Sequence, residues 1–187
     1  MMGFQVLETS KLLNYARARS LWIVTFCTGC GGVELPPTAT ARFDFERFGI
    51  ISTPSIRQAD LLLITGYVTP KTLKRIIIVY EMMRNPKYII AHGSCPVNAG
   101  IYWDSYNTVK KLDLYIPVDV WIAGCMPRPE AILRALVKLM KMVKEGKALG
   151  WKRYLENFEF YRKNQDRLFG KDWRKREIEK LRFYIHD

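Results

Sequence analysis

The sequence predicts an α/β fold with a mostly parallel sheet, and two observations support this prediction. Four short apolar runs each end in glycine or enter a Gly/Cys loop, which is typical of strands buried on both faces: LWIVTF (21–26), DLLLITG (60–66), KYIIAHG (87–93) and DVWIAG (119–124). Stretches with helical spacing follow the second and the last of these runs. Strands that alternate with helices are the pattern of a parallel sheet covered by helices.

The two long helices are predicted from their ends as well as from their spacing. The stretch PKTLKRIIIVYEMMRN begins with Pro70, which suits a first helical turn, and it ends at an Asn-Pro pair. The stretch PRPEAILRALVKLMKMVKEGK has apolar residues on one helical face, at positions 132, 133, 136, 137, 140 and 143.

Composition divides the chain into three parts. Residues 1–19 form an N-terminal segment, and residues 20–146 form the α/β domain. Residues 147–187 mix aromatic and charged side chains without a strand-like run, so we expect a basic, helical extension that contacts partners rather than folding alone. With 187 residues, of which 49% are hydrophobic, the chain can bury a sizeable core.

The net charge of +12 indicates acidic partners, which could be nucleic acid, anionic lipid or an acidic protein. A basic tail with interleaved aromatics would suit a nucleic-acid-binding protein, which is the competing class of function. The apolar runs are shorter than the roughly 20 residues of a membrane span, and the N-terminus does not look like a secretory signal. Without a secretory signal we expect the reducing setting of the cytoplasm, where cysteines are more often metal ligands or catalytic thiols than disulfides.

The four cysteines follow the ends of predicted strands. Cys27 comes directly after the first run, Cys95 two residues after the third, and Cys125 directly after the last, while Cys30 completes a CxxC motif with Cys27. Ligands of open α/β sheets bind beyond the carboxyl ends of the strands, so these loops could converge on one object.

Four kinds of chemistry are compatible with these cysteines. A zinc site usually takes its ligands from two close pairs, which Cys95 and Cys125 do not form. A thioredoxin-like dithiol needs only Cys27 and Cys30. An iron–sulfur cluster uses all four thiolates, and the glycines around them permit close backbone approach. Buried cysteines that serve only as small hydrophobic residues are the fourth possibility.

Four segments resemble a known family: ARFDFERFGI (41–50), RQADLLLITG (57–66), HGSCPVNAGIY (92–102) and IPVDVWIAGCMPRPEAI (116–132). They are similar to the cluster-bearing subunits of respiratory complex I, a family that includes the small subunits of membrane-bound nickel-iron hydrogenases. The resemblance implies a flavodoxin-like fold and one 4Fe-4S cluster bound by Cys27, Cys30, Cys95 and Cys125. It also implies an active site that lies largely on a partner subunit.

The motif CTGCGGVE combines a hydrogenase-like CxxC spacing with complex-I-like flanks, and AGCMP stands where complex I has PGCPP. This hybrid best resembles a branch of archaeal, ferredoxin-dependent, ion-pumping membrane complexes that reduce polysulfide or sulfane sulfur. The resemblance therefore implies an electron-transfer subunit of such an oxidoreductase. Proton reduction by a nickel-iron hydrogenase and quinone reduction by a complex I are the alternatives within the family.

The same resemblance implies the partners and the location. The partners are a large catalytic subunit of the hydrogenase or complex I type, a ferredoxin-like iron–sulfur subunit, membrane ion-pumping subunits, and ferredoxin as upstream donor. We expect a peripheral subunit on the cytoplasmic face of the membrane, without a transmembrane segment of its own.

Four other residues are candidates near the cysteines. Glu34 looks like the family's acidic residue beside the cluster and could couple redox change to protonation, or it could simply be a capping carboxylate or the partner of a nearby arginine. His92 could tune the cluster by hydrogen bonding, or it could be an ordinary satisfied histidine at a strand end. Tyr102 and Trp103 could line a crevice at a subunit interface, although simple packing is the more common role of such a pair.

Overall fold

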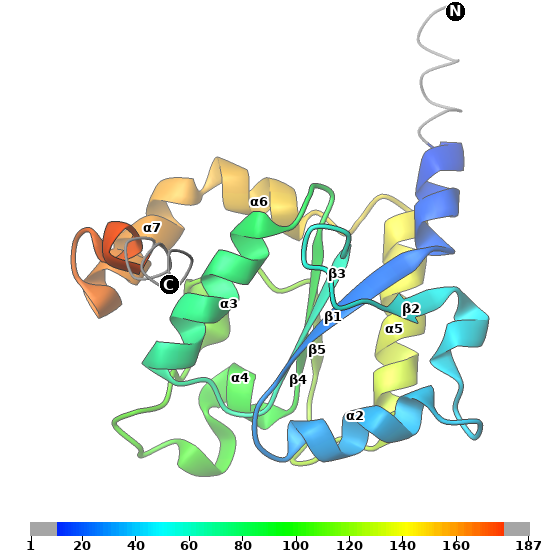
Figure 1. Ribbon diagram of the computed structural model, residues 1–187, viewed down its shortest axis with the longest axis horizontal. Helices are drawn as coiled ribbons and strands as arrows, with labels where there is room; N and C mark the ends of the chain where they lie inside the picture. Colours follow the sequence, from blue (N-terminus) through cyan, green and yellow to red (C-terminus); the bar gives the residue numbers. More distant parts are fainter. Residues whose placement is uncertain (1–10, 178–187) are drawn as a thin grey trace, which may run out of the picture.

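The computed structural model describes residues 11–177 (Figure 1). Its sheet has the strand order β2-β1-β3-β4-β5 and every pair is parallel, with the following bounds: β1 (Leu21–Cys27), β2 (Ile50–Ser52), β3 (Leu61–Thr65), β4 (Tyr88–His92) and β5 (Val120–Ile122). The α/β prediction is confirmed, and this order is that of flavodoxin-like sheets. Because all strands are parallel, their carboxyl ends lie at one edge, which we call the carboxyl edge.

The predicted long helices are present as α3 (Pro70–Met82) and α5 (Pro129–Lys144), each with proline in its first turn. Thr69 and Thr72 form a reciprocal capping box at the start of α3. The other helices are α2 (Gly31–Ala39), α4 (Ser94–Asn98), α6 (Gly150–Glu156), α7 (Phe158–Phe169) and the short 3-10 turns η1 (Phe45–Phe48), η2 (Gly100–Tyr102) and η3 (Leu112–Leu114). Residues 11–18 are also helical.

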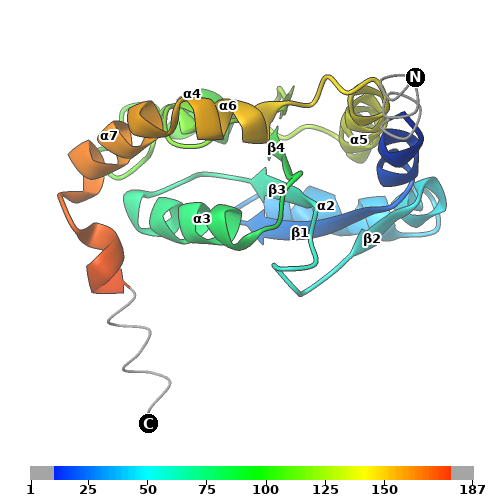
Figure 2. The ribbon, with the colours of Figure 1, turned by 90° about the horizontal axis from the view of Figure 1, so that it is seen from above.

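Helices cover both faces of the sheet and create two cores (Figures 1 and 2). One face carries α3, α6 and α7, and its core includes Leu62, Ile76 and Tyr80. The other face carries α2, α5 and the helix of residues 11–18, and its core includes Leu63 and Leu139. Strands β3 and β4 are buried along their whole length, as their continuous apolar runs predict.

The C-terminal strap, residues 147–177, packs on its own domain. Tyr154, Tyr161 and Trp173 are buried in the core of the α3 face, although the sequence predicts an extension that contacts partners rather than folding alone. The reason is that the rings of Tyr154, Tyr161 and Trp173 bury apolar area in the same core as the residues of α3. Contact with partners stays a prediction, and residues 178–187 of the predicted extension lie outside the described part.

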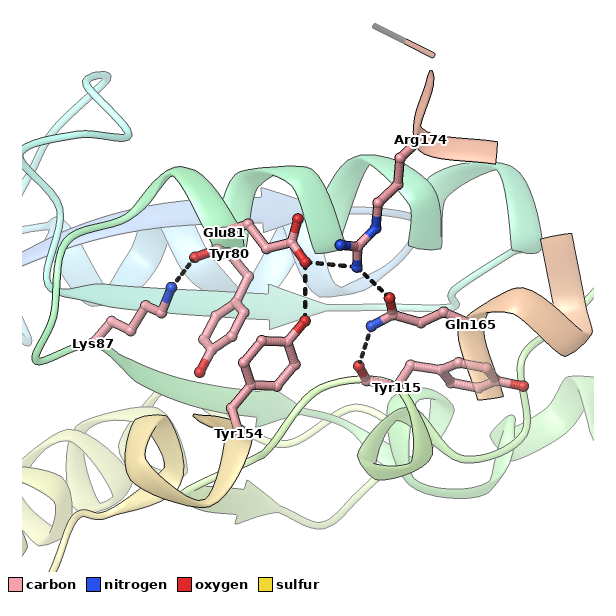
Figure 3. Close-up of polar contacts among 7 residues, drawn as sticks. All are labelled: Tyr80, Glu81, Lys87, Tyr115, Tyr154, Gln165 and Arg174. Carbon is pink, nitrogen blue, oxygen red and sulfur yellow. Dashed lines mark hydrogen bonds and ion pairs between the residues drawn. The ribbon is translucent and has the colours of Figure 1, made fainter. Parts of the chain in front are cut away.

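A chain of polar contacts ties the strap to α3 (Figure 3). The Glu81 carboxylate accepts a hydrogen bond from the Tyr154 hydroxyl at 3.0 Å and pairs with Arg174 at 2.7 Å. Arg174 also donates to the side chain of Gln165 at 2.6 Å, and Gln165 donates to the Tyr115 carbonyl at 2.9 Å. The strap is therefore joined both to α3 and to the segment that leads into β5.

The start of the strap is fixed by Asp119, which lies just before β5. Its carboxylate accepts from the backbone N–H of Ile89 at 3.0 Å and from that of Gly150 at 2.9 Å. A Cβ at Gly150 would lie 2.6 Å from this carboxylate, so only glycine permits the approach. Asp119 thus joins β4, β5 and the first turn of α6.

Candidate metal centre

Three parallel strands deliver the four cysteines to the carboxyl edge. Cys27 is the last residue of β1, Cys30 directly precedes α2, Cys95 is in α4 directly after β4, and Cys125 follows β5. None of them forms a disulfide, and Cys95 is buried while the other three are exposed. The placement predicted from the strand ends is therefore the placement observed.

One pocket collects most of these side chains. Cys30, Cys95 and Cys125 line it together with His92, and the remaining lining residues are Gly31, Gly66, Gly93, Ser94, Gly124, Met126 and Pro127. Cys27 is not a lining residue, but it lies next to Gly32, whose added Cβ would be 3.7 Å from the Cys27 Cβ. Burial raises the pKa of the Cys95 thiol, and the nearby Cys125 and Cys30 raise it further.

Glycine allows the CxxC loop to lie directly on the end of β3. Gly66 has a φ of +76°, and a Cβ there would fall 1.6 Å from the Thr28 carbonyl oxygen. A Cβ at Gly31 would lie 2.5 Å from the Thr65 Cβ. Side chains at these two positions would push the β1 and β3 loops apart, so the pocket depends on both glycines.

The structure does not give His92 the hydrogen bonds expected of an ordinary polar residue at a strand end. Its side chain is 1% exposed, and neither ring nitrogen has a hydrogen-bond partner of good geometry among residues 11–177. Burial lowers its pKa, while the Pro127 carbonyl and the Glu34 carboxylate nearby act in the opposite direction. The Pro127 carbonyl lies near the imidazole without good hydrogen-bond geometry, so the ring can still donate to a group bound in the pocket.

Glu34 lies in the first turn of α2 and is half-buried. Within the described part of the chain it forms no ion pair with an arginine, so the structure does not provide the pairing that is the alternative explanation for this residue. Its position at a helix start is electrostatically favourable for a carboxylate. A role in coupling protonation to redox change stays a prediction.

Tyr102 and Trp103 lie in the loop that follows Cys95 and are 41% and 67% exposed. Trp103 is therefore not a core residue. Tyr102 packs edge-on against Tyr67, with ring centroids 5.3 Å apart. Sequence reasoning missed Tyr67, and the only signal for it is its place two residues after the end of β3.

The donor set fits an iron–sulfur cluster better than a single metal ion. In residues 11–177, no three His, Cys, Asp or Glu side chains converge tightly enough to hold one ion. Three thiols around the pocket, with Cys27 on the adjoining loop, suit a group in which each of four irons takes one thiolate. The glycines leave room for such a group to approach the backbone.

Several known proteins are similar to this chain over most of its length. The model of the family described as NADH ubiquinone oxidoreductase, 20 Kd subunit, matches residues 27–139. The chain is 42% identical to a subunit of the F(420)H(2) dehydrogenase of Methanosarcina mazei, over 76% of this chain and 78% of that protein. It is 43% identical to a subunit of the NADH-quinone oxidoreductase of Citrifermentans bemidjiense, over 80% of this chain and 89% of that protein.

A solved structure is also similar. It is described as the membrane-bound sulfane sulfur reductase, an archaeal respiratory membrane complex. One of its chains is 66% identical to this one, with a TM-score of 0.86, over 93% of this chain and 98% of that chain. No helix in residues 11–177 is long and apolar enough to span a membrane.

Proposed function

The chain belongs to the family of the NADH ubiquinone oxidoreductase 20 Kd subunit, and from this premise we propose that it holds one 4Fe-4S cluster through Cys27, Cys30, Cys95 and Cys125. Its relatives are subunits of oxidoreductase complexes, and this chain is a subunit of that kind. In our proposal it is the electron-transfer subunit of a membrane-bound, ion-pumping respiratory oxidoreductase. The observation that carries the proposal is the convergence of cysteines from three strand ends around one pocket.

The cluster's chemistry is one-electron transfer, and the protein's part is to fix the position and potential of the cluster. The four thiolates would bind the irons, and the parallel strands would bring the loops that carry them to one edge of the sheet. His92 is the one buried polar side chain in the pocket wall without a partner among the described residues, so it can donate a hydrogen bond to the bound group. Such a bond would make the cluster easier to reduce, because it stabilises added negative charge.

The acceptor that we propose is polysulfide or sulfane sulfur, reduced at an active site on the large-subunit interface with electrons derived from ferredoxin. The support is the 66% identity to a chain of a sulfane sulfur reductase, which exceeds the 43% identity to the NADH-quinone oxidoreductase relative. The hybrid CTGCGGVE motif agrees with this branch. Partners would be the large catalytic subunit, a ferredoxin-like iron–sulfur subunit and membrane ion-pumping subunits.

The location that follows from these partners is the cytoplasmic face of the membrane, with the chain as a peripheral subunit. The net charge of +12 suits acidic partners such as ferredoxin and anionic lipid. Because these partners are acidic, they explain the positive net charge, and binding to nucleic acid is not needed to explain it.

Two measurements test the proposal. Protein prepared without oxygen should be brown and contain about four irons per chain. An iron-free, colourless preparation that binds single-stranded nucleic acid in a salt-dependent manner would overturn it. The intact complex should then reduce polysulfide with reduced ferredoxin. Hydrogen evolution or quinone reduction in place of sulfide formation would keep the cluster and replace the proposed acceptor.

A further inference from the structure

Tyr67, which directly follows the glycine after β3, lies between two of the loops that carry cysteines. Strand β1 pairs with β3 so that Cys27 is opposite Thr65. This register brings the residues after β3 beside the CxxC loop. Tyr67 is half-buried there. Its ring lies against Gly29 of the CxxC loop and packs edge-on against Tyr102 of the Cys95 loop.

The CxxC loop is attached to Tyr67 through both of its middle residues. The Thr28 hydroxyl donates to the Tyr67 carbonyl at 2.6 Å and lies 2.9 Å from the Thr65 carbonyl, while the Thr28 N–H donates to Thr65 at 3.1 Å. Gly29 lies under the Tyr67 ring, since a Cβ added there would be 2.9 Å from the ring carbon Cε1. Gly29 also has a φ of +58°, which favours glycine.

The other side of Tyr67 meets the loop of Cys95. Its ring packs against Tyr102 with centroids 5.3 Å apart and planes at 64°, a favourable edge-to-face arrangement. Tyr102 ends the 3-10 turn that follows α4, and its N–H donates to Ala99, whose own N–H donates to Cys95. Contacts thus run without a break from Thr28 and Gly29 through Tyr67 to the backbone of Cys95.

We propose that Tyr67 is a positioning residue that sets the spacing between the CxxC loop and the Cys95 loop, and so fixes how their thiolates hold the bound cluster. The inference rests on the proposed function, because it concerns the ligands of that cluster. It explains why Thr and Gly occupy the two middle positions of CxxC in this chain. Thr28 supplies the hydroxyl that fixes the loop to β3, and Gly29 supplies the space that the aromatic ring fills.

The test compares Tyr67→Ala and Tyr67→Phe in the full chain, purified without oxygen. Replacing a residue that orients metal ligands typically weakens metal binding 10- to 100-fold, so we expect iron release to a chelator to become about tenfold faster in Tyr67→Ala. After chemical reduction of the cluster, we also expect a broadened electron paramagnetic resonance spectrum, because the cluster would be held in several geometries. Tyr67→Phe keeps the ring and should behave as the unaltered chain does.

Gly29→Ala approaches the same contact from the other loop, and it should speed iron release both by displacing the ring and by straining a backbone whose φ of +58° favours glycine. The matched control is Tyr106→Ala, because Tyr106 is a fully exposed aromatic in the loop that follows Cys95 and its replacement should leave both measurements unchanged.

The inference would be overturned if iron release and the spectra were unaltered in both Tyr67→Ala and Gly29→Ala. A Tyr67→Phe variant as damaged as Tyr67→Ala would also overturn it, because the ring contact would then not be the cause. An unaltered chain without iron would instead refute the proposed function itself.

Discussion

The carboxyl edge and the C-terminal strap are built in opposite ways. At the carboxyl edge, three of the four thiols are exposed, His92 is buried without a partner among the described residues, and α4 is only five residues long. In the strap, aromatic rings are buried against α3, and the polar side chains of Gln165 and Arg174 are matched by hydrogen bonds and an ion pair. In the strap many polar side chains are paired within the chain, with the buried Trp173 indole N–H as an exception among the described residues, whereas the edge gathers thiols and an imidazole around one pocket.

This difference indicates which parts of the chain are stable without a bound metal group. Burial of the strap's aromatics stabilises the α3 face whether or not a metal group is bound. Three of the four cysteines at the edge are exposed, so the order of their loops should depend on the cluster that we propose. The two regions should therefore respond differently to the same perturbation.

The largest effect is expected when a thiol is removed. Cys125→Ser should lower the iron content from about four per chain to well below one, because a cubane depends on all four thiolates. Hydrogen exchange should then rise at residues 27–31 and 93–100 and stay unchanged in the strap. Iron analysis and exchange measured by mass spectrometry check this. Equal loosening of both regions would show that the strap also depends on the cluster.

The next largest effect is expected in the strap. Trp173 is 1% exposed and packs on Phe169 with ring centroids 5.0 Å apart. Trp173→Ala should lower the free energy of unfolding by about 3–5 kcal/mol, as large-to-small changes of buried aromatics do. Denaturant unfolding measures it, and Phe160→Ala is the control because Phe160 is 52% exposed. Iron per folded chain should not change, and a loss of iron would contradict the independence of the two regions.

Most of the sheet could be predicted from the sequence, and the reasons are local. The runs that became β3 and β4 are continuous and apolar because both of their faces are covered, and the runs of β1 and β5 could be recognised although some of their residues are exposed. Strand β2 was missed because it is a three-residue edge strand with Ile51 47% exposed. Helix α2 was missed because Pro36 and Pro37 lie inside it, and proline normally ends a helical pattern.

The site could be predicted to the extent that it follows from strand ends. Parallel strands bring their carboxyl ends together whatever their exact register, so the cysteines could be grouped from their positions alone. Tyr67 could not be found this way, because its contact with Gly29 depends on the register of β1 against β3. The strap's attachment was missed for a similar reason, since Glu81 and Arg174 meet only after α7 has packed on α3.

A smaller effect, and one that depends on pH, is expected at Lys87 near the C-terminal end of α3. Its ammonium donates to the Tyr80 carbonyl at 2.6 Å, and burial lowers its pKa from 10.5 to about 8 although Glu81 acts in the opposite direction. Below pH 8 the Lys87 ammonium is charged in both the folded and the unfolded chain. Its burial then lowers the free energy of unfolding by the full amount. Between pH 8 and 10.5 the folded chain has lost this proton while the unfolded chain keeps it, so stability should rise with pH by up to about 2 kcal/mol.

Unfolding measured from about pH 7 to about pH 10 tests this, with Lys87→Met as the comparison. In Lys87→Met the free energy of unfolding should not rise over this pH range. If both chains showed the same pH profile, Lys87 would not be the source of the rise. The range should stop near pH 10, because burial raises the pKa of Tyr88 and Tyr154 from 10.0 to about 12. Above about pH 10 the unfolded chain loses those phenolic protons first, which lowers stability and hides the lysine effect.

The smallest effect is expected for the ion pair that closes the strap. Glu81 and Arg174 are 31% and 22% exposed, so water screens their attraction and the pair should contribute about 0.5–1 kcal/mol. A double-mutant cycle with Glu81→Gln and Arg174→Met isolates this coupling, because each single change also disturbs Tyr154 or Gln165. High salt should reduce the coupling further. A coupling of zero would mean that the buried aromatics alone hold the strap, whereas any change in iron content across the cycle would mean that the strap and the carboxyl edge are not separate after all.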